Sequence, residues 1–388
     1  MEMVGVLIEV SSGGNLIEDA QPKGGIRMQT IRGALGVGVL VALIALVLSA
    51  CSGGSKEKGA SGGPPADDQI VFRRYLDPDQ AHAALFTMNS DGSHVRQITH
   101  PPQGWRDDSP VWSPDGQKVA LYRQAIDESM SRIMVVDPDT GDVREVTHCG
   151  SDQGQSRQGP PGRCESDFDP AFSPDGDSLA FDRLLGPDRD CCRIEGIWIV
   201  GLDGSNPHQV TNVDPKLPAA FADMGPQFSP DGKMLVFERV RVADDRHGVF
   251  VQPIGSPQDA RQITPWKLNC QDHPDWSSDG KLVLFRCLPD DGSLNIYWVH
   301  PDGTGLHQLT QKGTDKQNHY YLSSGFSPRF SASEGWITTS REPGYGEEGN
   351  ADVFRMRIED GEVVNSSNLT KSAIWDSAPD WGSHKPVR

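Results

Sequence analysis

PVWSPDG, at residues 110–116, is the stretch that decides the fold, because close variants of it recur along the chain. The variants are PAFSPDG (170–176), PQFSPDG (226–232), PDWSSDG (274–280), PRFSASEG (328–335) and PDWGS (379–383). A second motif, a triplet that ends in Thr, alternates with the first, at 97–99, 145–147, 209–211, 262–264, 308–310 and 368–370. Six copies of each motif in constant order indicate a repeat architecture, in which each copy is one supersecondary unit.

Each unit has the pattern of four short strands. The aromatic residue of the opening ends a first strand, and Pro-Asp-Gly or Ser-Asp-Gly makes a tight turn with Gly where a positive φ is needed. An apolar strand follows, such as KVALYR (118–123), and then a third strand, such as IMVVD (133–137). A fourth strand leads to the closing Thr. Four antiparallel strands in each repeat predict the blade of a β-propeller.

The two ends of the repeat region complete each other. The sixth opening, at 379–383, runs out of chain before its second strand, and a matching strand, IVFR, stands at 70–73. One blade is therefore built from both termini, which leaves no open strand edge between the first and last blades. The sequence predicts an all-β fold, a six-bladed β-propeller of four-stranded antiparallel blades over residues 70–388, closed by a blade shared between the N- and C-terminal segments.

The repeat resembles that of the TolB family of propellers. The shared core is D-x-x-P-x-[FW]-S-P-D-G, which reads DDSPVWSPDG at 107–116 and DFDPAFSPDG at 167–176. The resemblance extends over 70–383 and implies a propeller in the bacterial cell envelope. TolB itself carries a small α/β domain before its propeller, whereas only residues 52–69 separate Cys51 from the first predicted strand here. A literal TolB role in the Tol-Pal machinery is therefore not expected.

The N-terminal segment has the pattern of an export signal. Residues 28–50 contain Arg32, an uncharged apolar run at 33–47 and small residues before Cys51, the layout of a secretory signal peptide. The ending Leu-Ser-Ala-Cys resembles the lipobox of bacterial lipoproteins, which implies lipid acylation of Cys51. The alternative is a transmembrane anchor, for which the apolar stretch is at the short end of the usual length.

The segments around the signal are interpreted from their composition. Residues 1–27 hold four acidic residues upstream of the signal, so we interpret them as a non-native extension and Met28 as the start. Residues 51–69 are the lipidated Cys and a flexible tether rich in Gly and Ser. The expected location is the extracytoplasmic side of the bacterial cell membrane, with the chain held there by the lipid.

Charge and motifs narrow the class of function. The formal charge of −18 repels nucleic acid and anionic headgroups, so no nucleic-acid partner is expected. The sequence lacks a metalloprotease H-E-x-x-H, a Walker loop and a dinucleotide fingerprint, so we expect no catalytic residue, metal or cofactor. The isolated His273 and His319 are interpreted as ordinary loop residues. Trp105, Trp266 and Tyr320–Tyr321 are left open between sugar stacking, interface and packing roles.

Loops of variable length are expected on one face of the disc, opposite the short turns. Variable loops on a rigid scaffold are the usual place of binding, the alternative being neutral drift of loop length. Carboxylates recur at the start of the innermost strands, next to this face: Asp107, Asp167, Asp223, Asp272 and Asp376. They form a candidate binding ring at the channel mouth for a cation or a basic peptide. The structural alternative is that each bonds backbone amides and shapes the start of its strand.

Six cysteines follow Cys51, and an even set in an exported protein predicts disulfides. Zinc sites need closely spaced Cys pairs with matching His residues, and that spacing is missing. Cys270 starts one strand and Cys287 ends the next, so antiparallel pairing predicts a bond between them at a Cα separation of about 4.4–6.8 Å. The pairing of the others stays open: Cys149, Cys164, Cys191 and Cys192.

Two functions remain. The first is a lipid-anchored adaptor that binds a protein or peptide partner in the cell envelope through its variable-loop face. The second is a carbohydrate-active or metal-dependent enzyme, a lyase or hydrolase, with its site at the central channel.

Overall fold

The computed structural model describes residues 68–148, 164–185, 194–211, 221–292, 294–310, 320–321, 328–331, 335–343 and 350–382. All the described residues belong to one compact unit, Ala60–Arg388. The predicted signal, Cys51 and most of the tether lie outside them. Within these ranges the only helices are the short 3-10 turns η1 (Pro257–Asp259) and η2 (Trp266–Leu268), so the all-β prediction is confirmed. None of the described helices is long and apolar enough to cross a membrane.

Four sheets stand as separate blades. The sheet that joins the termini is β25–β1–β2–β3, at Asp376–Gly382, Gln69–Tyr75, Ala83–Asn89 and Arg96–Gln97. The next two are β12–β15, at Phe221–Phe228, Met234–Arg241, Arg246–Pro253 and Arg261–Gln262, and β16–β19, at Cys270–Trp276, Val283–Cys287, Asn295–Val299 and His307–Gln308. The fourth contains β20 to β24, at Tyr320–Tyr321, Arg329–Phe330, Trp336–Pro343, Asp352–Glu359 and Glu362–Asn368.

The remaining strands form one eight-stranded sheet. They are β4 to β11, at Trp105–Trp112, Val119–Ala125, Ser131–Val136, Val143–Glu145, Cys164–Phe172, Ser178–Leu185, Ile194–Gly201 and His208–Gln209. Ser131 of β6 pairs in parallel with Ser166 of β8, and its hydroxyl donates to the Asp167 carbonyl at 2.7 Å. This contact fuses the two halves of the sheet. The prediction of six separate blades is therefore wrong: four blades are separate, and an eight-stranded sheet accompanies them.

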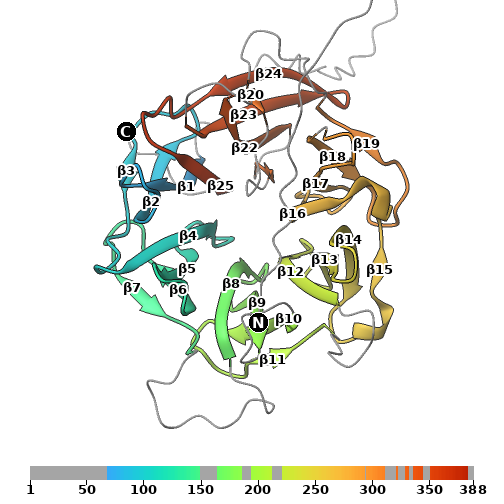
Figure 1. The fold of residues 1–388 in the computed structure, drawn as a ribbon, viewed down its shortest axis with the longest axis horizontal. Coiled ribbons are helices and arrows are strands. Elements are labelled where there is room, and N and C mark those ends of the chain that lie inside the picture. The colour runs from blue at the N-terminus through green and yellow to red at the C-terminus, as the bar shows by residue number, and fades with distance from the viewer. Residues whose placement is uncertain are drawn as a thin grey trace, which may run out of the picture. The chain divides into compact units, whose positions relative to one another are not determined.

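The sheets are arranged around a common centre as in a propeller (Figure 1). Their innermost strands contact one another in a closed series, β25 to β4, β8, β12, β16, β21 and back to β25. Apolar side chains fill the space between neighbouring sheets. One such cluster joins Val71 and Leu85 to Trp112, Val119 and Leu121. The core is thus divided among the sheet-to-sheet interfaces, and the innermost strands surround the channel.

The blade shared between the termini is confirmed. The C-terminal strand β25 pairs with β1 from Gln69↔Gly382 to Arg74↔Asp376. The Trp381 indole also donates to the Asp68 carboxylate at 3.1 Å. The ring therefore closes by hydrogen bonding between residues about 300 positions apart in sequence.

The two sequence motifs have clear structural roles. Each closing Thr accepts, at its hydroxyl, a backbone N–H of the third strand of its own repeat; the six are Thr99, Thr147, Thr211, Thr264, Thr310 and Thr370. In the opening motif, the Ser113 hydroxyl donates to Asp115 of the turn and accepts from the Lys118 amide. Thr therefore fastens the outermost strand, and Ser-Pro-Asp-Gly fixes the hairpin between the first two strands.

Candidate functional site

Four of the five carboxylates predicted to form a binding ring are instead partners in buried ion pairs. Each faces an Arg directly opposite it on the neighbouring strand, with the Arg Nε at 2.6 Å from one carboxylate oxygen: Asp107–Arg123, Asp167–Arg183, Asp223–Arg239 and Asp376–Arg74. The carboxylate side chains have 0% exposure. A second, parallel bond from the Arg Nη2 makes each pair bidentate.

This geometry corrects both interpretations of these residues. The carboxylates do not present free charge at a channel mouth, and their main partners are guanidinium groups rather than backbone amides. They join the first strand of a blade to the second. Asp272 lies in β16, its side chain outside the described part of the structure, and the residue opposite Arg286 is Gln271. The sequence contained a sign of these ion pairs, because an Arg stands sixteen residues after each of Asp107, Asp167 and Asp223.

Where the structure describes it, the channel is lined by a different set, the residue before the Pro of the opening motif in five of the innermost strands. Ser109, Asp169, Gly225, His273 and Ala378 all have a positive φ, between 39° and 59°, at a shift in strand register. Such a bulge bends the strand and redirects a side chain. These five residues surround a narrow cavity of about 20 Å³, room for one water molecule.

His273 and Asp169 bind each other across this cavity. Their Nε2 and Oδ2 atoms are 2.8 Å apart, and the strand that carries Gly225 lies between theirs. A Cβ at Gly225 would come to 2.5 Å from the His273 ring, so the missing side chain makes room for the pair. Burial lowers the pKa of His273, but the charge and hydrogen bond of Asp169 outweigh it and leave the pKa raised. His273 is therefore a strand residue at the channel, and its interpretation as a loop histidine is wrong; His319 lies outside the described residues.

A second layer of side chains in the channel comes from the residue that follows the Pro of each opening motif. Arg329 lies 3.7 Å from Asp275 and 3.8 Å from Asp380, and the hydrogen-bonding pattern assigns the Gln227 amide oxygen to the side facing the guanidinium, where it accepts from Arg329. Burial raises the pKa of Asp275 to about 6 because Arg329 offsets only part of the desolvation, and burial likewise raises the pKa of Asp380.

The carboxylates of this second layer also hold the ring together. Asp380 accepts the Trp112 amide at 2.7 Å, and Asp275 accepts the Phe330 amide at 2.8 Å. Each bond joins the innermost strand of one sheet to that of the next. Beyond this layer, at the short-turn end of the channel, a wider cavity of about 220 Å³ opens.

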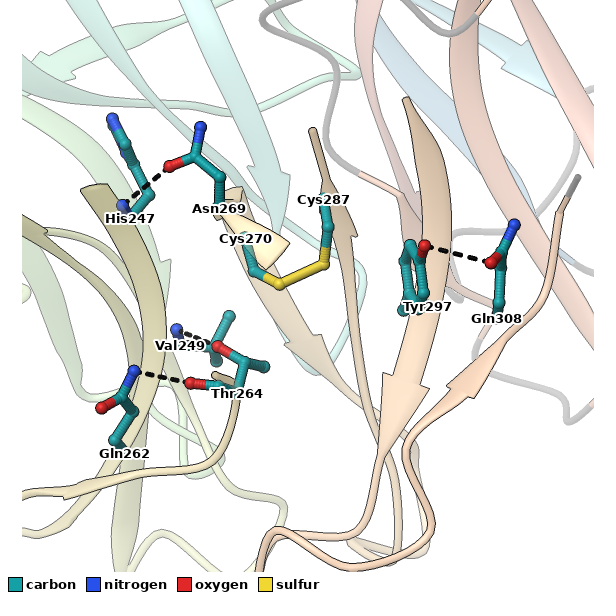
Figure 2. Close-up of a disulfide and its surroundings, with 9 residues drawn as sticks. All are labelled: His247, Val249, Gln262, Thr264, Asn269, Cys270, Cys287, Tyr297 and Gln308. Atoms are coloured by element: carbon teal, nitrogen blue, oxygen red, sulfur yellow. Dashed lines mark hydrogen bonds between the residues drawn. A yellow bond between two sulfur atoms is a disulfide. The ribbon is translucent and has the colours of Figure 1, made fainter. Parts of the chain in front are cut away.

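The Cys270–Cys287 disulfide is confirmed. It joins β16 to β17, beside the bond from the His247 amide to Asn269 (Figure 2). The two residues are directly opposed in the antiparallel pair, and their Cα separation of 3.9 Å is shorter than the predicted range. Cys164 is described only as a strand residue paired with Leu185, and Cys149, Cys191 and Cys192 lie outside the described residues.

Of the aromatic candidates, Trp266 packs against the core. Trp266 stacks on Phe221, with ring centroids 6.4 Å apart, and the Arg241 guanidinium carbon lies 4.7 Å from the centroid of the Trp266 ring. Trp105 is half-buried beneath Arg132. Tyr320 and Tyr321 pair with β22, and their side chains are not described. Among the described residues there is no group of three or more His, Cys, Asp or Glu arranged to hold a metal.

Comparison with known proteins identifies the fold. TolB from Acinetobacter baumannii superposes with a TM-score of 0.59 at 18% identity, over 82% of this chain and 68% of that one. Hydrazine synthase from Kuenenia stuttgartiensis gives 0.56 at 13% identity, over 84% and 48%. No family model matches the sequence. The chain has a TolB-like propeller fold, as its repeats predict.

A curated relative by sequence is an uncharacterized protein of Agrobacterium fabrum. It is 24% identical over 203 residues, which make up 52% of this chain and 58% of the relative. The matched region thus spans just over half the length of that protein.

Proposed function

We propose that the chain is an extracytoplasmic, lipid-anchored adaptor that binds a protein or peptide partner through its variable-loop face. The observation that carries the proposal is the filling of the channel. Asp169 and His273 bind each other there and leave about 20 Å³ between the strands. Pockets for small substrates usually measure about 300–1,000 Å³. A sugar therefore has no room beside the one described channel histidine, and the loops carried by the ring are the better binding element.

The ring supports such a role because it is rigid by construction. Buried bidentate ion pairs join the first two strands, closing threonines fasten the last, and Asp275 and Asp380 link neighbouring sheets. Loops held on such a scaffold keep a fixed arrangement without contributing to the core. The repeats resemble those of an envelope family, which agrees with a partner in the same compartment.

Site-specific crosslinking tests which face binds. A photo-crosslinking residue at Gln103 stands just before β4, on the variable-loop face, and one at Gln117 stands in the turn after β4, on the opposite face. Both positions are exposed glutamines in the segments that flank the same strand, β4, so they form a matched pair. In native envelopes we expect a discrete protein adduct from Gln103 and none from Gln117. An adduct from Gln117 alone would place the partner on the wrong face for this proposal.

The anchor is tested by Cys51→Ala. Without the thiol, acylation of residue 51 is impossible, so we expect the chain to lose lipid labelling and to leave the detergent phase in phase-partitioning experiments. Ser52→Ala, next to the same position, serves as the control and keeps the label. Full membrane retention of unlabelled Cys51→Ala would favour the transmembrane anchor instead.

A further inference from the structure

The cavity at the short-turn end of the channel has no role in the proposed adaptor function. It lies where β4, β16, β21 and β25 end, on the face opposite the variable loops. Its volume of about 220 Å³ is eleven times that of the narrow cavity and still below the size of a drug-sized pocket. Such a space admits one side chain or a ligand of similar size.

The floor of this cavity is acidic. Asp275 and Asp380 line it. One oxygen of each accepts an amide of the next sheet, from Phe330 and Trp112, and each carboxylate also accepts the amide of the residue that follows it, Trp276 and Trp381. Their other oxygens face the same guanidinium, Arg329, at 3.7 and 3.8 Å, which is longer than a direct hydrogen bond. Two carboxylates that share one distant cation are incompletely neutralised. Burial therefore raises the pKa of both, because Arg329 offsets only part of the desolvation.

The walls are aromatic. Four of the lining residues come from the [FW] position of the opening motif: Trp112, Trp276, Phe330 and Trp381. The three indoles are 5–7% exposed, so only a small part of each ring is available to a ligand. Aromatic walls give no oxygen ligands to a metal ion, whereas an organic cation gains from aromatic rings as well as from carboxylates.

We propose that this cavity binds the cationic head of a basic side chain, a guanidinium or ammonium group, supplied by a peptide. The head would approach the carboxylates of Asp275 and Asp380 from the cavity, on the side away from Arg329, and the alkyl stem would lie against the aromatic walls. The site is on the face opposite the adaptor surface, so this proposal does not depend on the proposed adaptor function.

Binding of N-acetylarginine amide to the full chain tests the site. The neutral isostere, N-acetylcitrulline amide, has nearly the same shape and no charge. Titration followed by calorimetry and by tryptophan fluorescence should show binding of the arginine probe at least tenfold tighter than that of the citrulline probe. Equal affinity of the two probes would overturn the proposal, and this comparison requires no variant to fold.

Two variants assign the site. Asp275→Asn and Asp380→Asn keep an oxygen for the Phe330 and Trp112 amides and remove the charge, so each should weaken the arginine probe about tenfold. Asp175→Asn changes an exposed carboxylate in the equivalent turn of another repeat, no residue of which lines the cavity, and should leave the affinity unchanged. Undiminished binding by both cavity variants, or equal weakening by Asp175→Asn, would show that the probe binds elsewhere.

Discussion

Removal of residues 376–388 will leave the chain aggregated or without a cooperative melting transition. The deletion takes away β25, the innermost strand of the blade that joins the termini. Strand β1 then loses its partner and presents an unpaired edge, which invites association with other chains. Ile70, Phe72 and Val353 lose the Trp381 side chain that covers them, and Arg74 loses its buried carboxylate.

A truncation after Gly382 is the matched control, because it keeps all of β25. Size-exclusion chromatography and calorimetry should show that this control elutes and melts like the full chain, whereas the longer deletion does neither. A soluble 1–375 protein with an unchanged melting temperature would mean that the ring does not depend on β25 for closure.

The repeat made most of the fold predictable, because each motif carries a local physical requirement. Gly at the turn, Thr at the last strand and the aromatic at the first strand act within one blade, so a single sequence displays them. The closure was also visible, since an incomplete unit at one end matched an incomplete unit at the other. The fusion of two blades was not visible, because it depends on one contact between Ser131 and the strand that begins at Cys164.

The sequence predicted the wrong channel-lining residues: those that line the channel mostly stand two positions after the predicted carboxylates, as Ser109 does after Asp107. Because side chains alternate between the two faces of a regular strand, Asp107 and its equivalents were predicted to point toward the channel. The strand carries a bulge at its Pro, which has no N–H to give to a ladder, and the bulge turns the flanking residues toward the channel instead. A Pro at a constant position in every innermost strand was the available sign of that bulge. The side chains then found in the channel, His273 and Arg329 among them, differ from repeat to repeat.

The buried Asp–Arg pairs are expected to dominate the stability of single blades. Asp223→Ala leaves Arg239 charged and enclosed by Phe221, Phe237 and Phe250, whose ring centroids lie 4.8–5.4 Å from the guanidinium carbon. An uncompensated buried charge costs about 3–5 kcal/mol of unfolding free energy. We expect a loss of that size, measured by urea denaturation of the full chain at neutral pH.

Asp231→Ala is the matched control for this pair, since Asp231 lies in the turn of the same sheet and its side chain is 55% exposed. Its pKa, lowered to about 2 by hydrogen bonds from Ser229 and Lys233, shows that it too has partners, so the comparison isolates burial rather than the presence of contacts. Asp223→Ala should cost far more than Asp231→Ala, and Asp223→Asn should fall between them because it retains an acceptor for Arg239. If the two alanine variants unfold at the same urea concentration, water must reach Arg239 and the pair does not hold the first strand of the blade to the second.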